Sequence, residues 1–294
     1  MRNLSKGNKR SKERKNSEFR RLIRQFKKNK AAMIGLIIFI LEIILAVLAP
    51  WISPYNYATM NMSAQFAPPS FTHLFGCDDV GRDILSRILY GARYSLSMGI
   101  IAALASNILG MIIGAIAGFV GGWVDNIIMR ICDVIQAIPG MLLVIILAAL
   151  FEPGFSNTIL ALTFSMITYP ARLIRGQMLK VRGNEYVEAE QSINASKARI
   201  IFIHLIPNCI SPLIVNTTMG IASRITFAAS LSFIGLGVQP PIPEWGAMLS
   251  SAREFMRRAP HLVIFPGLAI AMTVLSLNLM GDGLRDALDP RLKN

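Results

Sequence analysis

Charged side chains are scarce in this sequence. Only 16% of the 294 residues are Asp, Glu, Lys or Arg, whereas 53% are hydrophobic. Soluble domains carry about 25% charged residues. The deficit argues against an ordinary soluble protein and indicates a chain that lies largely in lipid.

Several kinds of functional site are also missing. The cysteines Cys77, Cys132 and Cys209 form no C-x-x-C pair, so neither a disulfide framework nor a metal site is expected. His73 lies four residues before Cys77, but no second cluster of ligands accompanies the two. The sequence has no G-x-x-x-x-G-K-S/T phosphate loop, and no Ser/His/Asp or paired-carboxylate arrangement stands out. We therefore predict no enzyme and no cofactor in this chain, and active transport would need energy from another polypeptide.

Positive charge is concentrated at the N-terminus. Residues 1–30 contain thirteen Lys and Arg against Glu13 and Glu18, a net charge of +11 out of +13 for the whole chain. A basic segment just before an apolar helix is typical of the cytoplasmic side of a membrane and of contact with anionic lipids. No nucleic-acid recognition module follows it, so we expect no nucleic-acid partner.

The basic tail also contains apolar residues at helical spacing, namely Phe19, Leu22, Ile23 and Phe26. This spacing predicts an amphipathic helix that lies in the membrane interface. A frayed basic leader is the alternative.

Hydropathy predicts six membrane-spanning helices and therefore an all-α polytopic membrane protein. The expected spans are Ala31–Pro50, Ser95–Val120, Ile135–Phe151, Asn157–Ile174, Ile210–Leu236 and His261–Met280. No small-residue cleavage site follows the first span, so we expect it to be retained. With the basic tail inside, an even number of spans returns the C-terminus to the cytoplasmic side of the cell membrane.

This topology divides the chain into five parts. They are a cytoplasmic tail (1–30), a first span (31–50), an extracytoplasmic segment (51–93), a core (94–283) and a cytoplasmic C-terminus (284–294). Residues 237–260 then lie outside and residues 177–208 inside.

Small residues, prolines and one acid modify the expected spans. Gly110, Gly114 and Gly118 share one helix face and predict a tight contact with another helix. Prolines predict bends that a helix bundle tolerates, at Pro139, Pro170, Pro212 and Pro266. Glu42 is nearly alone as an ionisable residue at depth, and no role is assigned to it.

One polar segment interrupts the apolar sequence. From Gly183 to Asn208 the chain reads GNEYVEAEQSINASKARIIFIHLIPN, a charge content that no spanning helix tolerates. We expect a helix over 184–193, a break at Asn194, and a second helix capped by Ser196 that ends at Pro207. The isoleucines of the second helix would pack on the cytoplasmic ends of the bundle, which leaves the first helix free to meet a partner.

This hairpin resembles the cytoplasmic EAA loop of membrane subunits in ATP-binding-cassette (ABC) importers. Glu188 and Ala189 match the Glu-Ala pair of that loop, and Asn194 stands where the family usually has glycine. Asn is the next residue after Gly to accept the left-handed conformation of a helix C-cap. Three further stretches resemble dipeptide and oligopeptide permeases, namely Ala67–Gly99, Leu231–Leu249 and Phe265–Leu292.

The resemblance implies a type I ABC importer permease (MetI-like) fold. It also implies a translocation subunit for di- or oligopeptides, with nickel chelates or glutathione as alternative solutes. The implied partners are a second related permease subunit, two ATPase subunits that bind ATP and Mg, and an extracytoplasmic solute-binding protein. The implied ATPase-docking residues lie in a coupling loop over 184–208 and are Glu185, Glu188, Ala189, Ser192, Asn194, Ala195 and Ser196.

Acidic and basic residues alternate in the expected outer segment, at Asp78, Asp79, Arg82, Asp83, Arg87 and Arg93. Arg82, Asp83, Ser86 and Arg87 are spaced for pairing along a helix. We expect a charge-paired structural cap over the bundle, and a direct role in receiving solute is the alternative.

Two other functions compete with an importer subunit. A self-sufficient secondary transporter needs intramembrane ion sites, and Glu42 alone does not supply them; no inverted repeat is visible either. A membrane anchor that recruits a protein through its basic tail leaves the polar hairpin and the bent spans unexplained.

Overall fold

The computed structural model describes residues 22–182 and 206–288. This part of the chain is helical and contains no β-strand beyond one isolated bridge between Cys77 and Asp83, which confirms the all-α prediction. The long helices are α2 (Lys30–Ile52), α3 (Ile84–Val120), α10 (Ile206–Phe233) and α12 (His261–Leu288). The shorter ones are α4 (Gly122–Ala137), α5 (Gly140–Ala149), α6 (Phe155–Ser165), α7 (Thr168–Arg182) and α11 (Trp245–Ala252), with 3-10 turns η1 (Met62–Ala64) and η3 (Arg253–Phe255).

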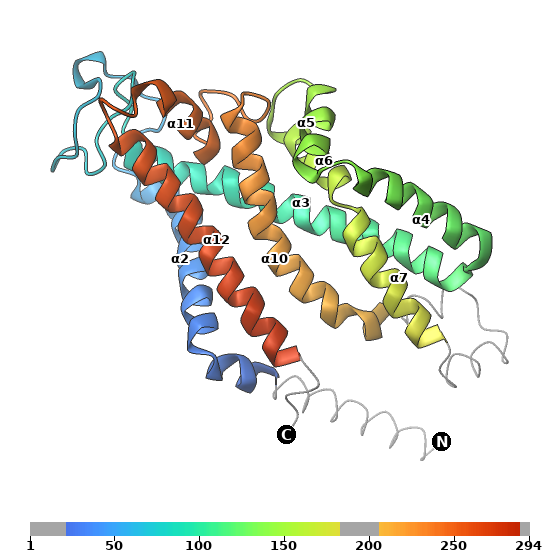
Figure 1. The fold of residues 1–294 in the computed structure, drawn as a ribbon. Coiled ribbons are helices and arrows are strands. Elements are labelled where there is room, and N and C mark those ends of the chain that lie inside the picture. The colour runs from blue at the N-terminus through green and yellow to red at the C-terminus, as the bar shows by residue number, and fades with distance from the viewer. Residues whose placement is uncertain (1–21, 183–205, 289–294) are drawn as a thin grey trace.

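Helix α3 holds the bundle together. It crosses behind α12, α10 and α7 at a steep angle to them, and it packs against α2, α7 and α10 (Figure 1). Its 37 residues give a length of about 55 Å. Helix α3 begins at Ile84, so the expected boundary between the outer segment and the core at residues 93 and 94 falls inside a helix.

Helices α2 and α12 pack side by side in opposite directions (Figure 1). Asn29 caps α2 by accepting a hydrogen bond from the Ala32 N–H at 3.1 Å, and its Nδ2 donates to Asp286 Oδ2 at 3.3 Å. The start of α2 and the end of α12 therefore lie at the same end of the bundle. This agrees with the expectation that both termini lie on one side of the membrane.

Within residues 22–182 and 206–288, three helices are long and apolar enough to cross a membrane by length and composition: α2, α3 and α12. A fourth candidate arises if α4 and α5 count as one bent span. The first, second and sixth predicted spans lie within α2, α3 and α12, and most of the fifth lies within α10. Among the described residues, the third and fourth are divided.

The predicted third span is not one continuous helix, and it breaks at the proline where a bend was expected. Helix α4 ends at Ala137, Ile138 is extended with φ −86° and ψ 127°, and α5 begins at Gly140. The two helices meet at an angle of 92°. Pro139 causes the break, because proline lacks the N–H that a helix needs and pushes the preceding residue out of the helical region.

The predicted fourth span is divided between α6 and α7. Met166 leaves the helical conformation with φ −112° and ψ 16°, and α7 starts at Thr168. Pro170 then falls in the first turn of α7, where the missing N–H needs no helical partner. The proline therefore starts a new helix and does not kink an old one.

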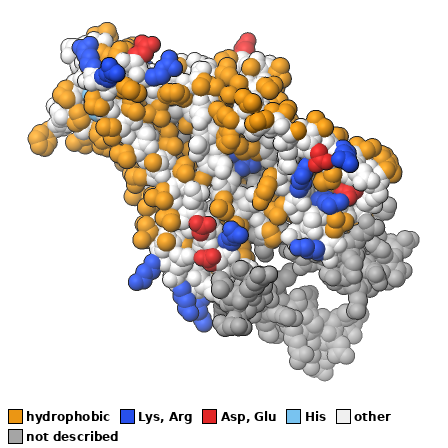
Figure 2. All heavy atoms as spheres, in the orientation of Figure 1, with side chains coloured by type: hydrophobic (Ala, Val, Ile, Leu, Met, Phe, Trp, Pro, Cys, Tyr) orange, Lys and Arg blue, Asp and Glu red, His pale blue; other side chains and the backbone are white. Residues whose placement is uncertain are grey.

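The surface is apolar between two charged ends (Figure 2). On α2, large side chains such as Ile37, Leu41 and Val47 are more than half exposed. Exposed apolar side chains of this density are stable in lipid and not in water. The surface therefore fits a protein embedded in a bilayer.

Candidate functional site

The predicted ATPase-docking loop lies outside the described residues, so all seven of its assigned residues, from Glu185 to Ser196, remain predictions. The structure does describe the helices on either side of it. Helix α7 leads into the loop and α10 follows it. The contacts of these two helices decide how a displacement of the loop would reach the rest of the bundle.

Helix α7 is locked to α3 along the predicted glycine face. A Cβ on Gly114 would stand 2.1 Å from the Ala171 carbonyl oxygen, and one on Gly118 would stand 2.6 Å from Met178 Cβ. At Gly110 an added Cβ would lie 2.6 Å from Pro170 Cγ. These distances are shorter than any van der Waals contact, so only glycine allows the two backbones to approach this closely. The predicted tight helix contact is confirmed.

Ion pairs also join α7 to α4. Arg175 Nε donates to Asp125 Oδ1 at 3.0 Å, and its Nη2 contacts the other carboxylate oxygen. Arg172 pairs with Asp133, which also lies 3.5 Å from Arg130. Because a planar guanidinium and a carboxylate fit each other in this two-point arrangement, the Arg175–Asp125 pair fixes orientation as well as distance. Helices α3, α4 and α7 therefore form one connected unit.

Helix α10 contacts α3 through polar side chains. Arg224 is only 4% exposed, and its guanidinium donates to Ser106 Oγ at 2.5 Å and to the Gly220 carbonyl at 3.0 Å. Its Nε has no partner, and no described carboxylate pairs with it. Two turns along α10, Asn216 donates to Asn107 Oδ1 at 2.8 Å. Close packing accompanies these polar contacts, because a Cβ on Gly99 of α3 would stand 2.3 Å from Ile225 Cγ1 of α10.

Glu42 was expected to be nearly the only ionisable residue deep in the membrane. Arg224 shows that this expectation was wrong. The arginine lies inside the predicted fifth span, in a window otherwise composed of small and apolar residues. A buried charge without an acidic partner is energetically unfavourable in a membrane and is retained for a reason.

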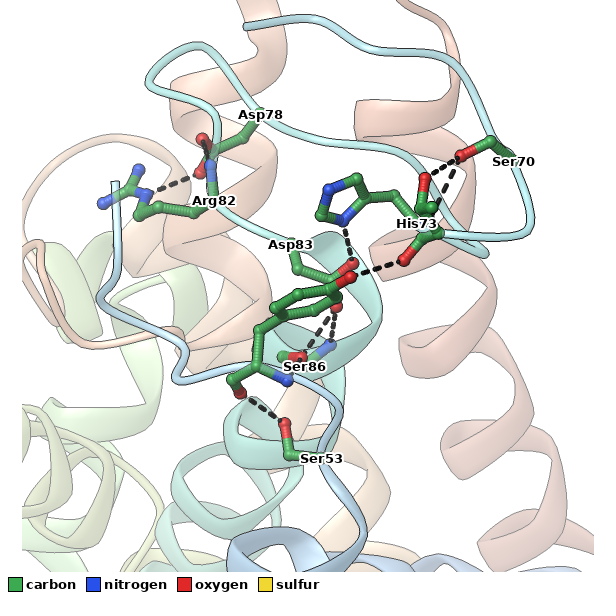
Figure 3. A network of polar contacts seen from close by, with 9 residues as sticks. Ser53, Ser70, His73, Asp78, Arg82, Asp83 and Ser86 are labelled. Atoms are coloured by element: carbon green, nitrogen blue, oxygen red, sulfur yellow. Dashed lines mark hydrogen bonds and ion pairs between the residues drawn. The ribbon is translucent and has the colours of Figure 1, made fainter. Parts of the chain in front are cut away.

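At the other end of the bundle, the charged segment before α3 forms a compact network (Figure 3). Asp78 accepts from Arg82 Nε at 2.6 Å and from the Arg82 N–H at 2.9 Å, and Arg87 Nε lies 3.6 Å from the same carboxylate. Arg87 also donates to the Tyr57 carbonyl at 3.1 Å. The pairing of these charges supports a structural cap. The partner of both arginines is Asp78, which precedes α3, so the predicted pairing within a helix is wrong.

Asp83 is the N-cap of α3 and links it to the preceding loop (Figure 3). Its Oδ2 accepts from the N–H and the hydroxyl of Ser86 at 2.8 and 2.7 Å. Its other oxygen lies 2.9 Å from His73 Nδ1, and Ser86 Oγ accepts from the Tyr55 N–H at 3.2 Å. The His73 ring therefore already has a carboxylate partner. Cys77 is a buried free thiol, and burial is the main reason that its pKa is raised to about 11.

Glu244 joins the second outer segment to α3. Its carboxylate accepts from the Ala247 N–H at 2.8 Å, as the N-cap of α11, and from Ser95 Oγ at 3.1 Å. Trp245 follows, and its indole donates to the Ile88 carbonyl at 3.1 Å. Burial raises the pKa of the Glu244 carboxyl, and these hydrogen bonds oppose that shift.

These observations define a helical membrane subunit. A buried charge network caps one end of it, and at the other end a connected helix unit leads into a polar loop. Residues 110–294 match the family described as binding-protein-dependent transport system inner membrane component, and residues 17–69 match the N-terminal TM domain of oligopeptide transport permease C. The chain therefore belongs to the family of binding-protein-dependent transport system inner membrane components, which are permease subunits of ABC importers.

The similarity to individual relatives extends over nearly the whole chain. The dipeptide transport system permease protein DppC of Escherichia coli (strain K12) is 48% identical over 274 residues, covering 91% of each chain. The glutathione transport system permease protein GsiD of Escherichia coli O6:K15:H31 is 46% identical over 276 residues, covering 92% of this chain and 89% of that one.

A chain from inward-facing structures of the MetNI methionine ABC transporter has the same fold. The TM-score is 0.58 at 15% identity, and the match covers 70% of this chain and 98% of that one. The predicted type I importer permease fold is thereby confirmed.

Proposed function

We propose that this permease subunit carries short peptides across the membrane. The observation that carries the proposal is the 48% identity to a dipeptide permease over 91% of both chains. Glutathione is the second candidate solute, because a glutathione permease is 46% identical over a similar length. Glutathione is itself a tripeptide, so both solutes present a peptide backbone and carboxylates to the pathway.

In this proposal the loop over 184–208 docks on a separate ATPase subunit. ATP and Mg bind to that partner, and Glu188 and Ala189 with their neighbours form the docking surface. Closure of two ATPase subunits would displace the loops and shift the bundle between inward-open and outward-open states. The permease chain then performs no chemistry and responds to the nucleotide only through its docked loop.

The contacts of α7 support this route. A displacement of the loop moves the end of α7, and the glycine contact with α3 and the Arg175–Asp125 pair with α4 require those helices to follow. The seam between α3 and α10 is also closely packed at Gly99, but it includes directional polar contacts such as Arg224 to Ser106, which can exchange partners. We therefore assign the relative movement within the subunit to the α3–α10 seam.

The proposed assembly contains a second related permease, two ATPases and a solute-binding protein that delivers solute on the outer side. Both termini of this chain lie in the cytoplasm. The basic tail supports this orientation through the positive-inside rule, as does the position of Asn29 beside Asp286 at one end of the bundle. The outer charge network then faces the solute-binding protein's side of the membrane.

Uptake measurements test the solute. Cells that lack the subunit and cells that regain it are compared for uptake of labelled dipeptides, oligopeptides, glutathione and chelated nickel. Restored uptake of dipeptides or oligopeptides supports the proposal. Restored uptake of glutathione alone favours the second candidate, and restored uptake of nickel alone contradicts both.

A further inference from the structure

A groove runs along the outer half of α2 where it meets α3. It is lined by Val47 and Trp51 from α2, Arg93 and Ser97 from α3, and Phe155 at the start of α6, with a volume of about 660 Å³. Small-molecule sites in proteins have volumes of about 300–1,000 Å³, so the groove can hold a single amphiphilic molecule. Its lining is mostly apolar, and the polar groups come from Arg93, Tyr94 and Ser97 of α3.

The groove lies at the depth of the outer leaflet. Helix α2 has 23 residues, a length of about 34 Å, which is close to the ~30 Å thickness of the hydrocarbon core. Trp51 lies at its last turn and is 76% exposed, as expected for a tryptophan at the membrane interface. The section of α2 from Ile43 to Trp51 therefore covers about 12 Å of the bilayer, from the interface inward.

Arg93 supplies an unmatched charge at this level. It is exposed, it lines the groove, and no described residue accepts a hydrogen bond from it or pairs with it. The other outer arginines before it, Arg82 and Arg87, are buried against Asp78. Arg93 is therefore the cation in this segment that is left for an external anion.

We propose that this groove binds a membrane phospholipid. The guanidinium of Arg93 donates hydrogen bonds to the lipid phosphate, an anion that its planar geometry fits well. One acyl chain lies against Val47 and the apolar side of α3, and Trp51 packs beside the glycerol region. A phosphate bound to Arg93, with a hydrocarbon chain along the apolar side chains, matches a groove that is lined by one cation and mostly apolar residues.

Photolabelling tests the site in the intact importer. The complex is reconstituted in nanodiscs that contain phosphatidylglycerol with a diazirine in its acyl chain, and labelled peptides are identified by mass spectrometry. We expect labels within residues 43–51 and 93–100. Arg93→Gln lowers this labelling about tenfold, because a charge-assisted hydrogen bond is lost. Arg257→Gln, which changes another exposed outer arginine, leaves the labelling unchanged.

A second pair of variants tests the apolar wall independently of the charge. Val47→Trp fills the groove and abolishes the labelling, whereas Leu48→Trp, which adds the same bulk on a different face of α2, does not. Both side chains are exposed in the subunit, so folding is preserved. Equal labelling of Arg93→Gln, Val47→Trp and the unmodified complex contradicts the proposal. So does a Val47→Cys variant that cross-links to the second permease subunit in place of lipid.

Discussion

Gly114 of α3 and Ala171 of α7 touch backbone to backbone, so closely that a Cβ on the glycine would stand 2.1 Å from the alanine carbonyl oxygen. The contact lies at the centre of the glycine face that ties α7 to α3. Since α7 leads directly into the proposed docking loop, this pair of residues lies on the route between the loop and the rest of the bundle.

Gly114→Ala is expected to separate α3 from α7. The added methyl group overpacks the contact and lowers the free energy of unfolding by about 1–3 kcal/mol. Gly176→Ala is the matched control, because no atom lies within 4 Å of a Cβ there and alanine favours helix. Thermal unfolding in detergent and peptide uptake measure the two effects. Equal stability of the Gly114→Ala and Gly176→Ala variants would contradict this prediction, because it would mean that α3 and α7 can move apart at little cost to accept the methyl group.

Asp125→Asn is expected to loosen α4 from α7. It removes the charge that faces Arg175, and loss of hydrogen bonds to a charged group costs about 1–3 kcal/mol. The exchange of both residues, Asp125→Arg with Arg175→Asp, restores part of the stability because the pair is rebuilt in reverse. Glu152→Gln, at an exposed position, serves as control. A double variant no more stable than Asp125→Asn would show that the pair itself contributes little.

Arg224→Met separates a structural role of the buried arginine from a functional one. The arginine has no acidic partner among the described residues, so an apolar side chain of similar length leaves stability unchanged or raises it by about 1–4 kcal/mol. Uptake falls, because the contact with Ser106 across the α3–α10 seam is lost. Ser223→Met, on the exposed side of the same turn, leaves uptake unchanged. Destabilisation of Arg224→Met with normal uptake per folded molecule would assign the arginine a structural role.

Glu244 is expected to make stability depend on pH. Burial raises the pKa of its carboxyl above the unfolded value, so the folded state binds the proton more tightly. The stabilisation is complete below the unfolded pKa of about 4.3 and is lost as pH rises through the folded pKa. Glu244→Gln removes this contribution, so its unfolding temperature in detergent changes less between pH 4 and pH 8. An identical pH profile in both proteins would show that the carboxyl does not titrate in this range.

The sequence predicted the helical class, the membrane location and a tight helix contact at the glycine face of α3, because these depend on local composition and on residues four apart on one face. It did not identify α7 as the partner helix. Pro139 predicted a bend in the third span, but neither its size of 92° nor the break at Met166 was predicted, since hydropathy measures how apolar a window is and not whether its helix is continuous. Arg224 was overlooked because one arginine barely changes the mean hydropathy of a long apolar segment.

Contacts between distant segments could not be predicted from spacing. Asp125 and Arg175 are 50 residues apart, and Ser95 and Glu244 are 149 apart, so only the packing of the helices brings them together. The predicted pairing of Arg82 and Arg87 along a helix was wrong for a local reason, because both arginines pair with Asp78, which lies before α3. Asp83 became the N-cap of α3, and the helix began too late to align these charges.

The proposed docking of the loop on an ATPase is tested most directly by Glu188→Lys, measured together with Ala189→Trp. We expect both variants to insert into the membrane in normal amounts, to lose co-purification with the ATPase subunits, and to lose peptide uptake. Normal uptake by a normally assembled complex in both variants would contradict the account, as would accessibility of residue 188 from the outer side of the membrane.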